Sequence, residues 1–182
     1  MRTHLLLMIA VLCFSVAGAE PVKVGDTKIT FEPPANFKPV PKEIIDLKWP
    51  SDRAPRYVVG NESATTTVAY DIKPHQIPQD KLGEVQTTFT RLFNQIIPGI
   101  EWKSNEIIEH SGQKWLLLEM TSRAIDTDIH NIMLVTGYQG KMLVFNFNST
   151  KEEFSRFEKE LRASLKSIKL PNSGETAERD PE

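Results

Sequence analysis

The sequence has almost no cysteine. Its one cysteine, Cys13, lies within the first 19 residues, and none follows it. The remainder of the chain therefore forms no internal disulfide and carries no thiol nucleophile. Thiol catalysis is excluded for residues 20–182, and an oxidising compartment neither stabilises nor threatens the fold.

The local motifs of common enzyme classes are also missing. The sequence contains no Gly-x-Ser-x-Gly turn, no His-Glu-x-x-His zinc motif, no P-loop and no Gly-x-Gly-x-x-Gly dinucleotide motif. These absences leave open only an enzyme whose site is assembled from residues far apart in the chain. We therefore expect a protein that is not an enzyme and that holds no cofactor and no metal.

No strong excess of one charge is present. The chain has 22 lysine and arginine residues against 24 aspartate and glutamate residues, and removing Arg2 leaves a net charge near −3. A nucleic-acid-binding protein would show a basic stripe, and docking on anionic lipid needs the same charge. The balance argues against both kinds of partner.

The first 19 residues have the pattern of a secretory signal. Arg2 and His4 precede an apolar run over residues 5–16, and Ala17 and Ala19 are the small residues that signal peptidase requires. The run is shorter than the roughly 20 residues of a bilayer span. We expect cleavage after Ala19 and a periplasmic or secreted bacterial protein. The alternatives are a retained anchoring helix and a lipid anchor at Cys13.

Residues 102–148 predict four consecutive antiparallel strands. The expected strands cover residues 102–110, 114–123, 129–138 and 141–148, and each pair is separated by a short turn. The turns contain Ser111-Gly112, Asp126-Thr127-Asp128 and Gln139-Gly140, residue types that favour tight turns. Connections this short join only antiparallel neighbours, so the order of these strands is almost forced.

The apolar pattern of these strands indicates that both faces of the sheet are covered. The second strand is apolar at Trp115, Leu116, Leu117, Leu118 and Met120, which places large side chains on both of its faces. Two amphipathic helices, expected at residues 79–97 and 152–168, provide the covers. The predicted fold is α+β, an α/β/α sandwich with a central, mostly antiparallel sheet and one long helix on each face.

The residues before the first long helix predict smaller elements. A hairpin is expected over residues 22–24 and 28–31, and two further strands over residues 57–59 and 64–72. We expect one domain over residues 20–170. The tail at residues 171–182 has no large apolar side chain and is expected to be disordered.

Residues 38–56 are the least regular internal stretch, with one short helical turn expected around residues 43–47. They carry Trp49, Arg53 and Arg56 and lead into Tyr57. Trp, Arg and Tyr are common anchors of protein interfaces, and long loops of compact domains often carry function. We predict a protein-binding site at these four residues. The alternative is that Trp49 folds back on the edge of the core.

A second hypothesis concerns His130, which lies close in sequence to Asp126 and Asp128. One imidazole and two carboxylates could bind a divalent cation in a small metal-dependent hydrolase. The competing interpretation is a hairpin turn in which the aspartates bond their own main chain. A third hypothesis is a carrier of lipid or a small ligand, with a cavity between one helix and the sheet.

Several segments together resemble one known family. They are the hairpin ending in Ile29-Thr30-Phe31-Glu32-Pro33-Pro34-Ala35-Asn36-Phe37, the helix ending in Ile97-Pro98-Gly99-Ile100, the turn at Gly112-Gln113-Lys114-Trp115, the strand start at Gly140-Lys141-Met142-Leu143, and the closing helix ending in Ser167-Ile168. Over about residues 22–170 the chain is similar to the PsbP-like α/β/α sandwich proteins, a group that includes bacterial DcrB-like envelope proteins.

The resemblance implies a function in binding. Members of the group are mostly adaptors, chaperones or assembly factors, and no functional residue is carried over from them. We expect a non-enzymatic protein-binding module: an adaptor, an assembly or envelope-associated factor, or an immunity or inhibitor protein. Its expected partner is another envelope or secreted protein, with no nucleic acid and no stable membrane insertion after signal cleavage.

Overall fold

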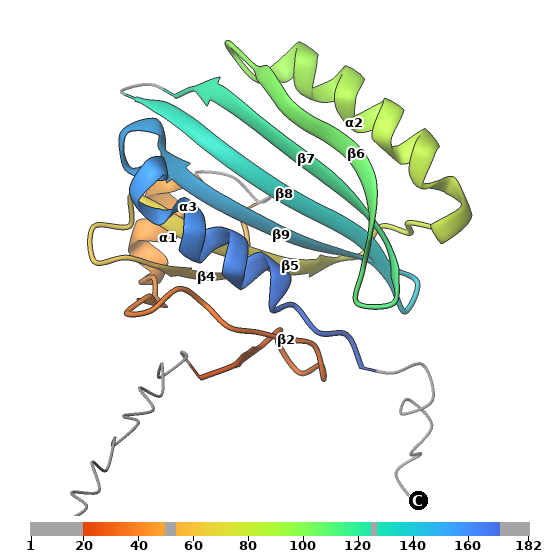
Figure 1. The fold of residues 1–182 in the computed structure, drawn as a ribbon, viewed down its shortest axis with the longest axis horizontal. Coiled ribbons are helices and arrows are strands. Elements are labelled where there is room, and N and C mark those ends of the chain that lie inside the picture. The colour runs from red at the N-terminus through yellow and green to blue at the C-terminus, as the bar shows by residue number, and fades with distance from the viewer. Residues whose placement is uncertain (1–19, 50–53, 125–126, 172–182) are drawn as a thin grey trace, which may run out of the picture.

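Seven strands form one antiparallel sheet in the order β3-β4-β5-β9-β8-β7-β6 (Figure 1). The computed structural model describes residues 20–49, 54–124 and 127–171. The expected signal segment and nearly all of the expected tail lie outside these residues. The strands are β3 (Lys38–Pro39), β4 (Tyr57–Gly60), β5 (Thr66–Lys73), β6 (Glu101–His110), β7 (Gln113–Arg123), β8 (Asp128–Tyr138) and β9 (Lys141–Thr150).

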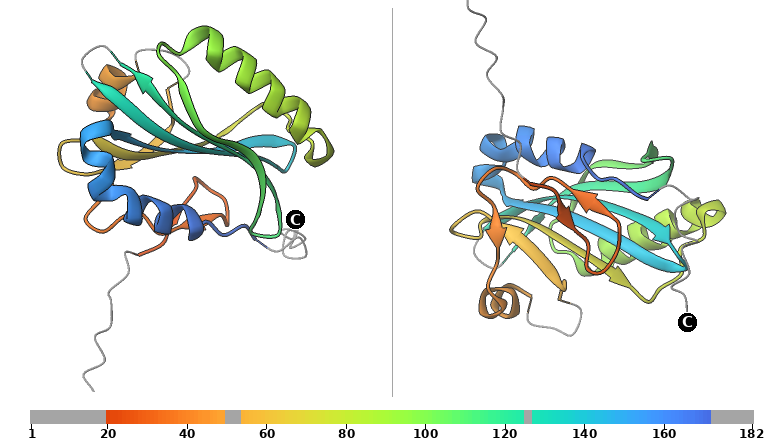
Figure 2. Two further views of the ribbon diagram at one scale, coloured as in Figure 1. Left: turned by 45° about the horizontal axis from the view of Figure 1, so that its top comes forward. Right: turned by 90° about the horizontal axis from the view of Figure 1, so that it is seen from below.

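The two long helices lie on opposite faces of the sheet (Figure 2). Helix α2 (Leu82–Ile96) covers β6 and β7, whereas α3 (Lys151–Lys166) lies over β5, β8 and β9. The short helix α1 (Lys42–Lys48) is on the same side as α2, because it packs with Ala69, which alternates along β5 with residues under α3. The predicted α/β/α sandwich is confirmed.

The core has one part on each face of the sheet. On the α3 face, Trp115, Phe145 and Phe147 are fully buried, and Phe145 contacts the rings of Phe31 and Tyr70. On the α2 face, Leu116, Leu118, Met120 and Val135 are buried against the helix. Strand β7 therefore places apolar side chains on both faces, as its continuous apolar run predicts.

A small hairpin completes the cover of the α3 face. Strands β1 (Val22–Lys23) and β2 (Thr30–Phe31) pair with each other, and Phe31 is fully buried. The amide of Thr30 donates to the carbonyl of Lys169 at 3.1 Å, and the amide of Lys169 donates to the carbonyl of Thr30 at 2.8 Å. The first and last parts of the described chain are thus joined.

A 3-10 turn, η1 (Gln79–Lys81), positions the start of α2. The Gln79 side chain donates to the Thr136 hydroxyl at 2.8 Å and accepts from the Lys114 amide at 3.0 Å. The segment before it crosses β8 at Gly137, where the Ile77 carbonyl lies so close that an added Cβ would be 2.0 Å from its oxygen. The crossing therefore requires glycine at position 137.

The two edges of the sheet differ. Edge strand β3 has two residues, and one of them, Pro39, has no amide hydrogen. Edge strand β6 has ten residues and one register irregularity, between Trp102 and Ser104. Long unpaired edges expose main-chain donors and acceptors that attract other strands. A partner strand could therefore be added at β6 rather than at β3.

Candidate functional site

The structure places three of the four residues predicted to bind a protein, Trp49, Arg56 and Tyr57, at different depths. Trp49 is half-buried and packs against the cluster under α1, and Tyr57 stacks on Tyr70 with ring centroids 5.5 Å apart. Arg56 has a side chain 66% exposed, with its Nε 3.8 Å from Asp71. Arg53 lies outside the described residues. The binding role of these four residues stays a prediction.

The first half of the same irregular stretch lines a groove of about 910 Å³. We call it the α1–α3 groove, because its walls come from residues 35–41, Ile44 of α1, the β4–β5 turn and the first turns of α3. Its apolar side chains include Phe37, Val40, Ile44 and Phe157, and its charged ones are Lys38, Glu62, Glu153 and Arg156. An apolar floor with charges of both signs suits a protein surface.

The walls of the α1–α3 groove are held in place by aromatic and charged contacts. Phe37 meets Phe157 edge to face, with centroids 5.8 Å apart, and the Arg156 guanidinium lies 5.1 Å from the Phe157 ring centroid. The Glu153 carboxylate accepts hydrogen bonds from Thr65 Oγ1 at 2.5 Å and Asn61 Nδ2 at 3.3 Å. Helix α3 thereby fixes the β4–β5 turn, and the groove is largely preformed.

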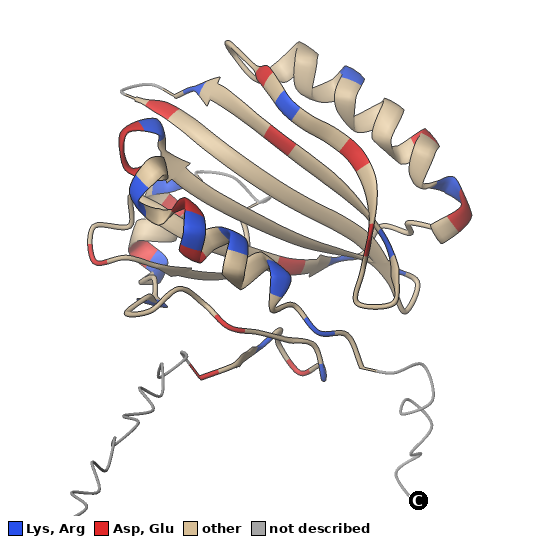
Figure 3. Ribbon diagram, viewed as in Figure 1, with Lys and Arg blue, Asp and Glu red and all other residues tan. Residues whose placement is uncertain are grey.

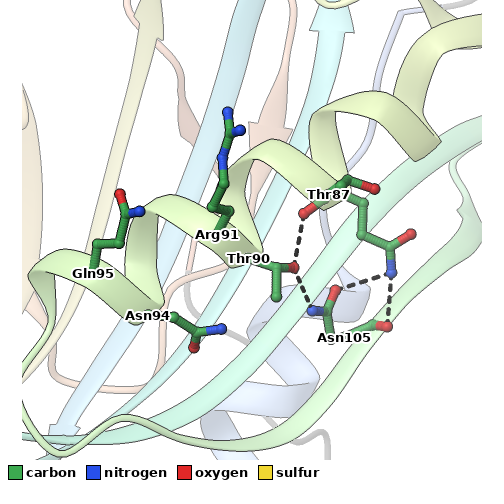
Figure 4. Close-up of a pocket in the computed structure, with 7 residues that line it drawn as sticks. Thr87, Thr90, Arg91, Asn94, Gln95 and Asn105 are labelled. Atoms are coloured by element: carbon green, nitrogen blue, oxygen red, sulfur yellow. Dashed lines mark hydrogen bonds between the residues drawn. The ribbon is translucent and has the colours of Figure 1, made fainter.

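A second, shallower depression of about 660 Å³ lies between the flank of α2 and β6 (Figure 4). Apart from Arg91, its lining is entirely neutral and polar, formed by Gln86, Thr87, Thr90, Asn94, Gln95 and Asn105. Gln86 Nε2 donates to the side-chain oxygen of Asn105 at 2.9 Å and to its main-chain oxygen at 2.8 Å, and Asn105 Nδ2 donates to Thr90 Oγ1 at 2.7 Å. We call this depression the α2–β6 trough.

An ionic network between a partly exposed arginine and two buried side chains joins α3 to the sheet. Arg162 of α3 makes two hydrogen bonds to Glu119 of β7, at 2.8 and 3.2 Å, and Glu119 Oε1 also lies 2.8 Å from His130 Nε2 of β8. The bonds from His130 and Arg162 lower the pKa of Glu119 to about 2, against the opposing effect of burial. The Phe154 ring stacks on His130 with centroids 3.5 Å apart.

This network gives His130 a different partner from the one in the metal hypothesis. Asp128 pairs with Lys151 at 3.4 Å, whereas the carboxylate that contacts His130 is Glu119. Among residues 20–49, 54–124 and 127–171, no group of three His, Cys, Asp or Glu side chains is placed to hold a metal. Asp126 lies outside these ranges.

Sequence reasoning missed Glu119 and Arg162. Glu119 is one charge inside the apolar run of β7, and Arg162 is one of many charges on α3. The signal that could have found them is the charge in β7, because a carboxylate in a strand buried on both faces requires a positive partner. The pairing of β7 with β8, which brings His130 close to Glu119, could also have been predicted from the sequence, since the short connection between the two strands limits their register.

The fold and grooves together define a class: an α/β/α sandwich with a preformed groove on one side and a free sheet edge on the other. No helix in the described part of the chain is long and apolar enough to cross a membrane. No family model matches the sequence, and no curated protein matches it. Solved structures of similar shape do exist, and they show the fold alone.

Cyanobacterial PsbP from Synechocystis sp. PCC 6803 is similar over 90% of this chain and 99% of its own, at a TM-score of 0.60 and 16% identity. LpqN, involved in cell envelope biogenesis of Mycobacterium tuberculosis, has a TM-score of 0.55 at 14% identity, covering 82% of this chain and 88% of its own. A putative regulator of unknown function from Pseudomonas aeruginosa has a TM-score of 0.51 at 11% identity, covering 85% and 98%. The fold is therefore PsbP-like, as expected. The DcrB-like part of the resemblance stays a prediction.

Proposed function

We propose that the protein is a non-enzymatic binding module outside the cytoplasm, periplasmic or secreted, that holds another envelope or secreted protein in the α1–α3 groove. The observation that carries the proposal is the groove itself. It combines the large apolar side chains of Phe37, Val40, Ile44 and Phe157 with four charged ones and is braced by α3. Partner proteins are recognised by such mixed surfaces, in which apolar contacts give affinity and charges fix orientation.

The similar structures support the same setting. One of them is a protein involved in cell envelope biogenesis, and the signal pattern of residues 1–19 predicts export to the same region of the cell. On this proposal residues 1–19 are removed after Ala19, and residues 20–170 form the one binding domain. The irregular stretch predicted to bind contributes residues 38–41 and Ile44 to the groove walls.

The prediction for the groove compares two apolar positions of the same short helix. A photoreactive amino acid replaces Ile44, which lines the groove, or Leu47, which is 76% exposed and lies outside the groove lining. Irradiation of cells should cross-link Ile44 to one protein species at a yield at least about tenfold above Leu47, because only the first position faces the bound partner. Mass spectrometry of the cross-linked band identifies the partner.

An additional change tests whether the groove chemistry is responsible. Arg156→Glu reverses a charge on the wall and removes the cation from the Phe157 ring, so it should abolish the cross-link at Ile44 while leaving the thermal unfolding midpoint nearly unchanged. Equal yields at the two positions, or a cross-link that survives Arg156→Glu, would show that the groove is not the binding surface.

A further inference from the structure

The outer edge of β6 exposes main-chain hydrogen-bonding groups in a defined pattern. β6 and β7 are joined by the two-residue turn Ser111-Gly112, in which both residues have positive φ angles, 47° and 77°. The residues that flank such a turn, His110 and Gln113, form a hydrogen-bonded pair, and bonded and non-bonded pairs then alternate along the ladder.

Counting from His110 assigns a direction to each main-chain group of β6. The groups of Ile108, Glu106 and Ser104 point toward β7, so those of Glu109, Ile107 and Asn105 point outward. The hydrogen bond from Gln86 of α2 to the Asn105 carbonyl agrees with this assignment. No strand of the described chain pairs with this edge, which leaves the outward groups of Ile107 and Glu109 for another backbone.

Only the first part of β6 carries a register irregularity, one of the usual protections of an exposed edge. The register irregularity between Trp102 and Ser104 and the charge of Lys103 interrupt the first part of the strand. From Asn105 to Glu109 the strand is regular, and Ile107 is 39% exposed. A strand added here would be confined to this regular half, because the irregularity blocks further pairing.

The side chains of β6 specify what kind of strand would fit. Glu106 and Glu109 are exposed acidic residues, and acidic side chains outnumber basic ones along this strand (Figure 3). Opposite charges favour each other across a strand pair, and apolar residues pair well with Ile107 and Ile108. An antiparallel partner therefore has a basic residue opposite each glutamate and two apolar residues between them.

The α2–β6 trough borders the regular half of β6 at its Asn105 end. Its amide side chains, among them Gln86, Asn94 and Gln95, each offer both donors and acceptors. Such groups satisfy an extended backbone without selecting particular side chains. The trough meets the regular half of β6 at Asn105, and its other end lies beside the first part of the strand, where Trp102 Nε1 donates to Asn94 Oδ1 at 2.9 Å.

We propose that the regular half of β6 binds an extended segment of a partner protein as an eighth, antiparallel strand, and that this segment carries the pattern basic, apolar, apolar, basic. Strand addition is an established mode of peptide recognition in which main-chain bonds give affinity and side chains give specificity. The proposal is independent of the α1–α3 groove, which lies at the opposite edge of the sheet.

The test uses an acetylated and amidated peptide, Thr-Lys-Val-Val-Lys-Thr, titrated into ¹⁵N-labelled protein. We expect saturable chemical-shift changes at the amides of Ile107 and Glu109. The matched control peptide carries an N-methyl group on the second valine, whose amide faces β6 in the proposed register. This control peptide should bind about tenfold more weakly, because the methyl group removes one main-chain hydrogen bond and keeps the peptide main chain from approaching β6 closely.

Two protein variants separate main-chain from side-chain effects. Ile107→Pro removes an outward donor while leaving the β6–β7 ladder intact, and should weaken binding of the unmodified peptide at least about tenfold. Ile107→Val keeps the donor and should bind as the native protein does. Amide spectra of both variants report whether the sheet is retained. The double variant Glu106→Lys, Glu109→Lys tests the side-chain contribution to peptide binding, because it leaves the main-chain donors and acceptors of β6 unchanged.

Three outcomes would overturn the proposal. The first is the absence of saturable binding by the unmodified peptide, and the second is equal binding of the N-methylated peptide. The third is a dimer of the native protein, measured by light scattering, that Ile107→Pro converts to a monomer, because a second copy of the chain would then occupy the edge. Failure of any kind here leaves the cross-linking result for Ile44 unaffected.

Discussion

Replacing Glu119 by alanine is expected to lower the free energy of unfolding by about 3 kcal/mol. The side chain of Glu119 is 10% exposed and is the common acceptor for His130 and Arg162. Its removal leaves the Arg162 guanidinium without its two bonds to the sheet, and α3 loses its ionic connection to β7. Urea denaturation at pH 7, followed by circular dichroism, measures the change.

The matched control is an exposed ion pair of the same chain. Lys42 and Asp46 lie one helical turn apart in α1, with side chains 80% and 56% exposed, and Asp46→Ala should cost less than about 0.5 kcal/mol. If both alanine variants change the unfolding free energy equally, burial does not strengthen the Glu119 network.

The same network makes stability depend on pH in a defined direction. The hydrogen bonds from His130 and Arg162 hold the folded-state pKa of Glu119 at about 2, below the ordinary value of 4.5. A lowered carboxyl pKa gives stability that is fully present above about pH 4.5 and is lost as the pH falls toward 2. Glu119→Gln should therefore show a smaller loss of stability between pH 4.5 and 2 than the native protein.

Gly137→Ala is expected to destabilise the protein by about 3 kcal/mol or more. The new Cβ would lie 2.0 Å from the main-chain oxygen of Ile77, and a main-chain atom cannot move away as a flexible side chain can. The crossing segment must shift, and with it η1 and the first turn of α2. Thermal and urea unfolding give the magnitude, and amide spectra should show the largest changes around Ile77 and Leu82.

Gly83 provides the control, because the same change to alanine is expected to raise the stability of the protein there rather than lower it. It lies in the first turn of α2, and a Cβ there meets no atom within 4 Å. Gly83→Ala should raise stability by roughly 0.5–1 kcal/mol, because alanine loses less conformational freedom in a helix. A destabilisation of similar size at both glycines would exclude the close crossing over β8 as the cause.

The sequence predicted the strand meander well because each of its signals is local. Short turns force antiparallel neighbours, and the apolar pattern of β7 required a helix on each face, which α2 and α3 provide. Most helix and strand ends agree within two residues, but α2 begins at Leu82, three residues later than expected, because residues 79–81 form the 3-10 turn η1. Strand β5 begins at Thr66, two residues later than expected, because residues 61–65 form the turn in which Ala64 takes a positive φ of 53°.

The binding surfaces were harder to predict because they depend on contacts between distant segments. The α1–α3 groove brings Phe37 against Phe157, and no local pattern connects these two aromatic residues. The pairing of β5 with β9 likewise joins strands that are not neighbours in the chain. The free edge of β6, in contrast, follows from the meander order, once it is known that nothing in the described chain pairs outside it.

The bridge between Thr30 and Lys169 has a consequence for synthesis of the chain. The hairpin that carries Phe31 leaves the ribosome early, whereas its pairing partner follows the last helix. The α3 face of the core therefore stays open until nearly the whole domain has been made, since closing a loop of this length gains nothing before both ends are present. The domain can close only after Lys169 has been made, and a nascent chain exposes its aromatic residues until then.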